Sequence, residues 1–126
     1  MKRLWIGVGI LLVLLALGIG TTVFAVRTHT GISQTLQQAS EAALAGKWAE
    51  ASSLSLDAKT KWESCRKETA AIADHEPMEE IDDLFSQMEV FLKTRQQIPL
   101  SACCASLSVL IEAIGEAHAI NWWSLL

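Results

Sequence analysis

Residues 74–83 have the sequence Asp74-His75-Glu76-Pro77-Met78-Glu79-Glu80-Ile81-Asp82-Asp83, and they separate two long helical patterns. The stretch holds six of the chain's fourteen acidic residues and one of its two prolines. Proline is favoured in the first turn of a helix because its missing N–H would have no partner there, and it disfavours helical conformation at the preceding residue. Acidic side chains are favoured near the positive end of the helix dipole. The stretch therefore predicts a helix that begins at Pro77, with Glu76 outside it.

Apolar residues recur at helical spacing on both sides of this stretch. Upstream they predict a helix from about Ile32, ended by Gly46 as a left-handed cap, and a second helix over residues 48–73. Downstream, the helix from Pro77 is followed by one that opens at Pro99 and ends between residues 118 and 121. The predicted core positions are Ile32, Leu36, Ala39, Ala43, Ala51, Leu54, Ala58, Trp62, Cys65, Thr69, Ile72, Met78, Ile81, Leu84, Phe85, Met88, Phe91, Leu92, Leu100, Cys103, Leu107, Leu110, Ile111 and Ile114.

Four helical patterns joined by connections of a few residues place neighbouring helices antiparallel. The sequence has no alternating strand pattern and no Asn-Gly turn. The predicted fold is all-α: an antiparallel up-down-up-down four-helix bundle made of two helical hairpins, preceded by a single N-terminal transmembrane helix.

Residues 4–26 form an uncharged, apolar segment with Lys2 and Arg3 before it and Arg27 after it. As a helix it spans roughly 34 Å, enough to cross a bilayer core of about 30 Å. The positive-inside rule predicts a cytoplasmic N-terminus. We therefore expect residues 1–27 to anchor the chain in the cell membrane and residues 28–126 to form one extracytoplasmic domain. The polar joint at residues 28–31 is a place where the helix is expected to break or bend.

A cleaved signal peptide is the alternative for this segment. Val23-Phe24-Ala25 has the small-residue pattern of a cleavage site, so cleavage would follow Ala25. The apolar run is longer than the usual core of a signal sequence, about 7–15 residues, which favours a retained anchor.

The domain after the anchor is acidic. Residues 28–126 contain seven Lys and Arg against fourteen Asp and Glu, a net charge of −7, which argues against binding to nucleic acid or to anionic lipid headgroups. The chain has no Gly-x-Ser-x-Gly, no Cys-x-x-Cys and no phosphate-binding glycine motif. We therefore expect no enzymatic activity, no catalytic residue and no cofactor.

Three cysteines, Cys65, Cys103 and Cys104, lie in the expected extracytoplasmic domain. An odd number excludes complete intramolecular pairing, and two adjacent helical cysteines cannot bridge each other without strain. A bridge from Cys65 to Cys103 or Cys104 stays open, with buried thiols as the default.

A metal site is one candidate function of the acidic stretch. If the last two helices pair about a centre at residues 97–98, Glu79 lies level with Glu116 and Asp83 with Glu112, while His75 and His118 fall near the same end. Carboxylates and imidazoles on facing helices can hold a divalent cation. However, the acids lie one step from the apolar stripes, and the helix dipole alone favours acids in the first turn. The simpler interpretation assigns no metal ligand.

The C-terminal residues are candidates for contact with a partner. Trp122, Trp123, Leu125 and Leu126 place two aromatic rings and two leucines in five residues. They either fold back to cap the bundle or contact lipid or a partner protein, because an exposed apolar patch of this size marks a contact site.

Three features together resemble a known bacterial family, the domain of unknown function 4363. They are the short anchor, the stretch from His75 to Asp82, and the ending Ile114-Gly115-Glu116-Ala117-His118 followed by Trp123-Ser124-Leu125-Leu126. The resemblance implies a small membrane-anchored helical protein and no activity, cofactor or catalytic residue. Pro77-Met78-Glu79 interrupts the family's His-x-Glu-Ile-Asp pattern, and Ser124 stands where asparagine is commoner.

We expect a non-enzymatic interaction or accessory subunit of a membrane complex. Its expected partners are the membrane and another membrane protein or a second copy of the chain. A divalent-cation-binding or sensing domain is the alternative. A pure spacer is a third possibility, which the sequence does not separate from the first.

Overall fold

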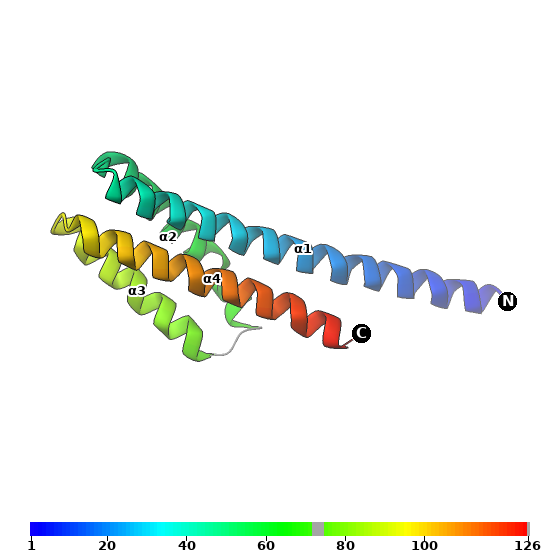
Figure 1. Ribbon diagram of the computed structural model, residues 1–126. Coiled ribbons are helices and arrows are strands. Elements are labelled where there is room, and N and C mark those ends of the chain that lie inside the picture. Colours follow the sequence, from blue (N-terminus) through cyan, green and yellow to red (C-terminus); the bar gives the residue numbers. More distant parts are fainter. Residues whose placement is uncertain (72–74, 126) are drawn as a thin grey trace.

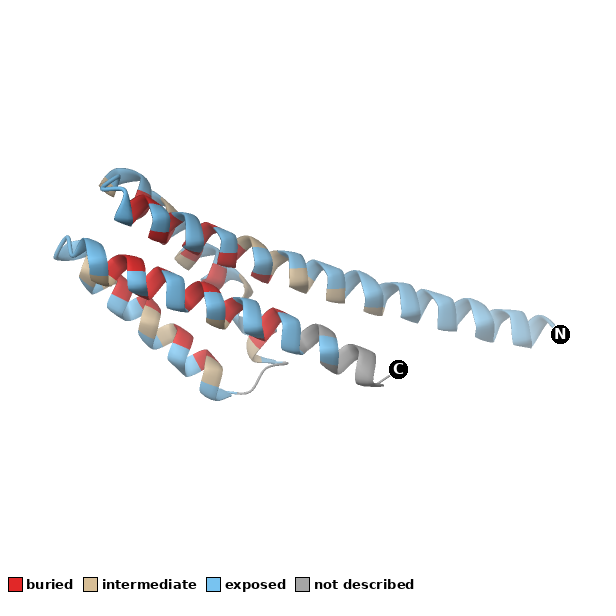
Figure 2. Cartoon of the chain, in the orientation of Figure 1, coloured by how far each residue is buried: buried red, intermediate tan, exposed pale blue. Residues whose placement is uncertain are grey.

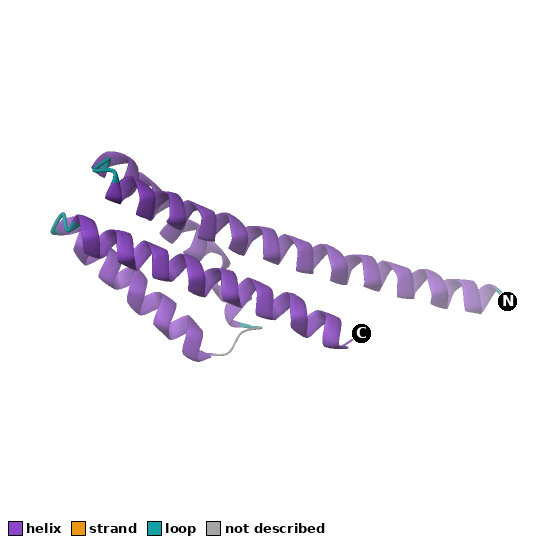
Figure 3. Cartoon of the chain, viewed as in Figure 1, coloured by secondary structure: helices purple, strands orange, loops and turns teal. Residues whose placement is uncertain are grey.

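The computed structural model describes residues 1–71 and 75–125, of which residues 118, 119 and 121–125 are described by their backbone alone. The described residues form helices and no strand, as predicted (Figures 1 and 3). Four helices pack together: α1 (Lys2–Leu44), α2 (Trp48–Ala70), α3 (His75–Lys93) and α4 (Gln97–Leu125).

Helix α1 is continuous through the polar joint, so the expected break at residues 28–31 is wrong. Thr28 Oγ1 donates to the Phe24 carbonyl at 2.9 Å, and Thr35 Oγ1 donates to the Gly31 carbonyl at 2.9 Å. Side chains that bond back to the carbonyl four residues earlier satisfy their own polar groups without interrupting the helix. The apolar segment and the first bundle helix are therefore one helix of 43 residues.

The prolines lie inside the first turns of their helices, although the sequence predicted each proline as the first residue of its helix. Helix α3 begins at His75 and α4 at Gln97, so Pro77 and Pro99 are each the third residue. A helix tolerates this because its first four N–H groups have no intrahelical partner. Glu76 is consequently helical, contrary to the prediction.

Two helix ends also differ from the prediction. Helix α2 ends at Ala70, short of the expected residue 73, and residues 72–74 lie outside the described part of the chain. Helix α4 continues to Leu125, past the expected end between residues 118 and 121. Gly115 therefore does not weaken α4 enough to end it.

Two turns of the same geometry close the helical hairpins. Gly46 follows α1 with φ 75°, which confirms the predicted left-handed cap, and Arg95 occupies the corresponding position after α3 with φ 52°. In both turns the next residue's N–H returns to the helix, Lys47 to the Ala42 carbonyl at 2.9 Å and Gln96 to Phe91 at 3.0 Å. Gln97 Nε2 donates to the Leu44 carbonyl at 3.3 Å, so the two turns lie together at one end (Figure 1).

The core lies between the C-terminal half of α1 and the other three helices (Figure 2). Trp62 is its largest buried side chain and stacks on Phe85 with ring centroids 6.3 Å apart. Among the predicted core positions, those described are buried or half-buried. The fully buried ones are Ile32, Leu36, Ala39, Ala43, Ala51, Ala58, Trp62, Thr69, Met78, Ile81, Phe85, Met88, Leu100, Cys103, Leu107, Ile111 and Ile114.

Candidate functional site

Two pairs of buried serines join α1 to α4. The hydroxyl oxygens of Ser33 and Ser108 lie 2.8 Å apart, and so do those of Ser40 and Ser101. Each hydroxyl is also within hydrogen-bond distance of its partner's backbone carbonyl, at 2.9 to 3.2 Å. Small side chains that bond across two helices allow close approach of the backbones. We call the contact made by these four residues the serine seam.

The serine seam fixes how the two long helices are aligned. The serines are seven residues apart on each helix, and moving toward the N-terminus of α1 corresponds to moving toward the C-terminus of α4. Seven residues before Ser33 on α1 is Val26, and seven residues after Ser108 on α4 is Gly115, so these two residues lie level with each other. A Cβ added at Gly115 would lie 3.0 Å from the Cβ of His29, one helical turn from Val26. Gly115 thus continues the seam at a position where an added Cβ would crowd His29.

His29 occupies the point where α1 leaves the bundle, and only 5% of it is exposed. Its Nδ1 lies 2.7 Å from the Ala25 carbonyl, which can only accept, so this nitrogen carries a proton. Its Nε2 lies 3.2 Å from the Thr69 hydroxyl on α2. The ring also meets Trp62 edge-on, with centroids 6.3 Å apart. His29 therefore ties α1 to the last turn of α2.

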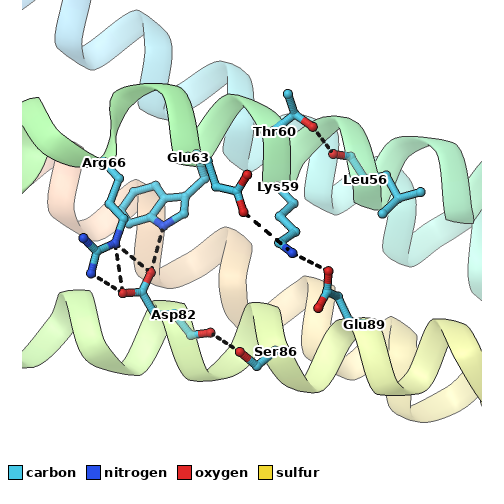
Figure 4. Close-up of polar contacts among 9 residues, drawn as sticks. Leu56, Lys59, Thr60, Glu63, Arg66, Asp82, Ser86 and Glu89 are labelled. Carbon is cyan, nitrogen blue, oxygen red and sulfur yellow. Dashed lines mark hydrogen bonds and ion pairs between the residues drawn. The ribbon is translucent and has the colours of Figure 1, made fainter.

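Charged side chains join α2 to α3, the less closely packed neighbours (Figure 4). Arg66 donates to both carboxylate oxygens of Asp82, and Lys59 pairs with Glu89. The indole N–H of Trp62 donates to Asp82 at 3.3 Å. The hydrogen bonds from Arg66 lower the pKa of Asp82, and the bond from Lys59 lowers the pKa of Glu89. Asp82 and Glu89 therefore stabilise the contact between α2 and α3.

The candidate metal ligands do not form a described cluster. His75, Glu79 and Asp83 are exposed on α3, and Glu112 and Glu116 are exposed on α4. The side chain of His118 is outside what the structure describes. Over the described residues, no group of three or more His, Cys, Asp or Glu side chains could hold a metal ion. Among the described acidic side chains of residues 75–83, Asp82 is the one that bonds to another helix.

The three cysteines are free thiols. Cys103 is buried and its Sγ donates to the Leu84 carbonyl at 3.1 Å, while Cys104 lies 3.6 Å from the Ser55 hydroxyl. Burial raises the pKa of Cys103 to about 11 and raises the pKa of Cys65 and Cys104 as well. Because the thiolate is the reactive form, these residues are suited to packing.

The N-terminal half of α1 projects from the bundle (Figure 2). Its most apolar stretch of 18 residues contains no buried residue, whereas Gln97–Ala117, which is also long and apolar enough to cross a membrane, is half buried in the core. Leu4, Trp5 and Phe24 are 73 to 74% exposed. This projecting segment is the largest candidate contact surface of the described chain.

Comparison with known proteins places the chain in a family. A family model described as Domain of unknown function (DUF4363) matches residues 23–124. The chain belongs to DUF4363. This confirms the resemblance inferred from the sequence. No curated protein and no solved structure matches the chain.

Apart from the apolar N-terminal segment, the residues that suggested DUF4363 lie on α3 and α4. His75 to Asp82 open α3, and residues 114–118 lie in the second half of α4. The partner-contact candidates Trp122, Trp123 and Leu125 are in the last turns of α4, but their side chains are not described, and Leu126 lies outside the described residues. Their contacts stay predictions for this DUF4363 chain.

Sequence analysis missed the serine seam and His29. A signal was present, since small residues recur every seven positions as Ser33 and Ser40 on one helix and Ser101, Ser108 and Gly115 on the other. It was overlooked because the apolar stripes alone were used to define the core.

Proposed function

We propose that this DUF4363 protein is a membrane-anchored accessory subunit, in which residues 4–26 of α1 cross the bilayer. The observation that carries the proposal is the contrast within one helix: α1 is packed into a core over its C-terminal half and exposes large apolar side chains over its N-terminal half. Such a surface is unfavourable in water and matches a bilayer in length and composition.

The second part of the proposal is an up-down-up-down bundle. Two pairs of contacts support it. Ser33 with Ser108 and Ser40 with Ser101 run in opposite directions along α1 and α4. Lys59 with Glu89 and Arg66 with Asp82 do the same along α2 and α3, again seven residues apart.

The proposed bundle stands outside the cytoplasm. Lys2 and Arg3 precede the apolar segment and Arg27 follows it, so the basic residues favour a cytoplasmic N-terminus. Helix α1 is continuous through residues 28–31, so the proposed anchor and the first bundle helix are one helix. A partner that binds the bundle would thereby be held at a fixed height above the membrane.

We propose an interaction role because the buried polar groups that the structure describes serve the fold. The serine hydroxyls bond across the seam, His29 bonds to Thr69, and the thiols are buried with raised pKa values. The partner is another membrane protein or a second copy of the chain.

Co-purification from the native membrane tests this function. The intact protein, solubilised in mild detergent and affinity-tagged, is expected to retain a membrane-protein partner or a second, differently tagged copy, identified by mass spectrometry. A matched variant carries an unrelated apolar helix in place of residues 4–26. We expect it to retain the partner, since the bundle surface is unchanged. Recovery of the protein as a soluble monomer would contradict the proposal.

A further inference from the structure

The last charged residues of α1 and α4, going from the bundle toward the projecting half of α1, lie at the same level. On α1, Arg27 is followed toward the N-terminus by 23 residues without a charged side chain. On α4, Glu116 is followed by ten residues that include no Asp, Glu, Lys or Arg and one histidine, His118. The serine seam places Arg27 level with Ile114. Glu116 is two residues beyond that position, an offset of about 3 Å along a helix.

The two helices remain neighbours beyond this level. On α1, Gly18, Thr22, Ala25 and Val26 are half-buried and lie on one helical face, whereas most residues around them are exposed. This face continues toward His29, which meets Gly115 of α4. Helix α4 runs on to Leu125 in the direction in which the N-terminal half of α1 projects (Figure 1). The C-terminal part of α4 therefore accompanies the apolar segment of α1.

We propose that residues 117–125 of α4 enter the outer leaflet of the bilayer beside α1, so that the bundle rests on the membrane at the level of Arg27 and Glu116. The proposal rests on the membrane anchoring proposed above. A planar boundary between water and hydrocarbon explains why two separate helices change from charged to uncharged at one level. A protein partner on either helix would not require that coincidence.

The depth of α4 follows from the alignment. A hydrocarbon core of about 30 Å accommodates about 20 helical residues, which extend from Leu4 to about Val23. The seam places Ile120 level with Thr21 and Leu125 level with Ala16. Ile120 then lies just inside the outer boundary of the hydrocarbon, and Leu125 lies about 10 Å below that boundary.

Val109 and Ile120 form a matched pair for a test. Each side chain is 67% exposed, and eleven residues separate them, which is three helical turns and returns to the same face. Val109 is level with Ile32, well above the proposed membrane surface. The two positions therefore differ in their distance from the proposed membrane surface and are equally exposed in the protein.

Spin labels on the full chain, purified and reconstituted alone in phosphatidylcholine vesicles, measure this height. The labels are attached at Val109→Cys, Ile120→Cys and Leu15→Cys in a Cys65→Ala background, since Cys103 and Cys104 are buried. Collision with oxygen, which concentrates in lipid, is compared with collision with a water-soluble nickel complex. We expect the ratio of oxygen to nickel collisions to be several-fold higher at residue 120 than at 109, and highest at residue 15.

The three positions separate the two proposals. A high ratio at residue 15 with equal, low ratios at 109 and 120 would overturn the leaflet insertion and leave the anchor standing. A low ratio at residue 15 would overturn both. Helical content is measured for each labelled protein and identifies a variant that has unfolded. If Ile120→Cys unfolds, Ser124→Cys, four residues further along α4, replaces it. Its ratio of oxygen to nickel collisions is again expected to be several-fold higher than at residue 109.

Discussion

The hydroxyl oxygens of Ser33 and Ser108 lie 2.8 Å apart in the buried contact between α1 and α4. Each can bond to the other or to the other's backbone carbonyl, so the pair is satisfied without water. Together with the pair Ser40 and Ser101, this pair aligns α4 with α1. The alignment determines which residue of α1 lies level with each residue of α4.

Replacement of Ser108 by alanine is expected to lower the free energy of unfolding by about 1 kcal/mol, because one buried hydrogen bond is lost and the Ser33 hydroxyl keeps a carbonyl partner. Replacement by valine forces the helices apart and costs about 1–3 kcal/mol. Thermal unfolding in detergent, followed by circular dichroism, measures both. Ser53→Ala on the exposed face of α2 is the control and should be neutral. A neutral Ser108→Val would show that the seam is not closely packed.

Two glycines of the long helices should respond oppositely to alanine. A Cβ at Gly115 would lie 3.0 Å from the Cβ of His29, whereas nothing lies within 4 Å of a Cβ at Gly31. Alanine in a helix is favoured over glycine by up to about 1 kcal/mol, so Gly31→Ala should stabilise the protein. Gly115→Ala should destabilise it, since helix α1 must move. The unfolding temperatures of the two variants test this prediction. An equal rise of the unfolding temperature in both variants would argue against close approach of the helices at Gly115.

The two hairpin turns offer another opposed pair. Arg95 adopts a left-handed conformation that costs a residue with a side chain roughly 1–2 kcal/mol, while Gly46 adopts it without this cost. Arg95→Gly should therefore raise the free energy of unfolding by about 1 kcal/mol, and Gly46→Ala should lower it by a similar amount. Denaturant titrations that showed loss of stability in Arg95→Gly would indicate that the Arg95 side chain itself supports the turn.

Acid should weaken the contact between α2 and α3. Arg66 lowers the pKa of Asp82 in the folded protein, so the ionised carboxylate contributes stability above its unfolded pKa of about 3.9. That contribution is lost as the pH falls through the lower, folded pKa. The stability difference between the wild type and Asp82→Asn should therefore shrink below about pH 4, and it should be small at pH 7 because the pair is partly exposed.

Asp82→Ala should be more damaging than Asp82→Asn. An asparagine oxygen can still accept from the buried Trp62 indole, whereas alanine leaves that N–H without its Asp82 partner, at a cost of about 1–3 kcal/mol. Denaturant unfolding followed by circular dichroism measures the stability of both variants. Equal losses in the two would show that the charge, and not the indole bond, matters.

The sequence predicted the helical class, the core stripes and the Gly46 cap because these depend on periodicity and local geometry. Helix boundaries were less accurate. The sequence predicts Pro77 and Pro99 as first residues, whereas each is the third residue of its helix, where an N–H would have no intrahelical partner either. The predicted break before Ile32 is wrong because α1 continues through it, with the hydroxyls of Thr28 and Thr35 bonded to carbonyls four residues earlier. The serine seam depends on how two distant helices align, which apolar periodicity does not reveal.

The contact candidates Trp122, Trp123, Leu125 and Leu126 were predicted from composition alone, and their side chains lie outside what the structure describes. The candidate metal ligands were predicted from their spacing. Glu79, Asp83, Glu112 and Glu116 are exposed, and the sequence could not show that Asp82, beside them, would turn toward α2. The projecting half of α1 was predictable because length and the absence of charge are sufficient to identify such a segment.

Labelling of one cysteine tests the placement of the bundle outside the cytoplasm. Ser53 is exposed on α2, and Ser53→Cys in the full chain with Cys65→Ala is treated in intact cells with a membrane-impermeant maleimide, before and after permeabilisation. We predict labelling of residue 53 without permeabilisation, in protein that stays with the membrane after an alkaline carbonate wash. Labelling only after permeabilisation, or recovery of the labelled protein in the soluble fraction, would contradict the proposed anchor and its orientation.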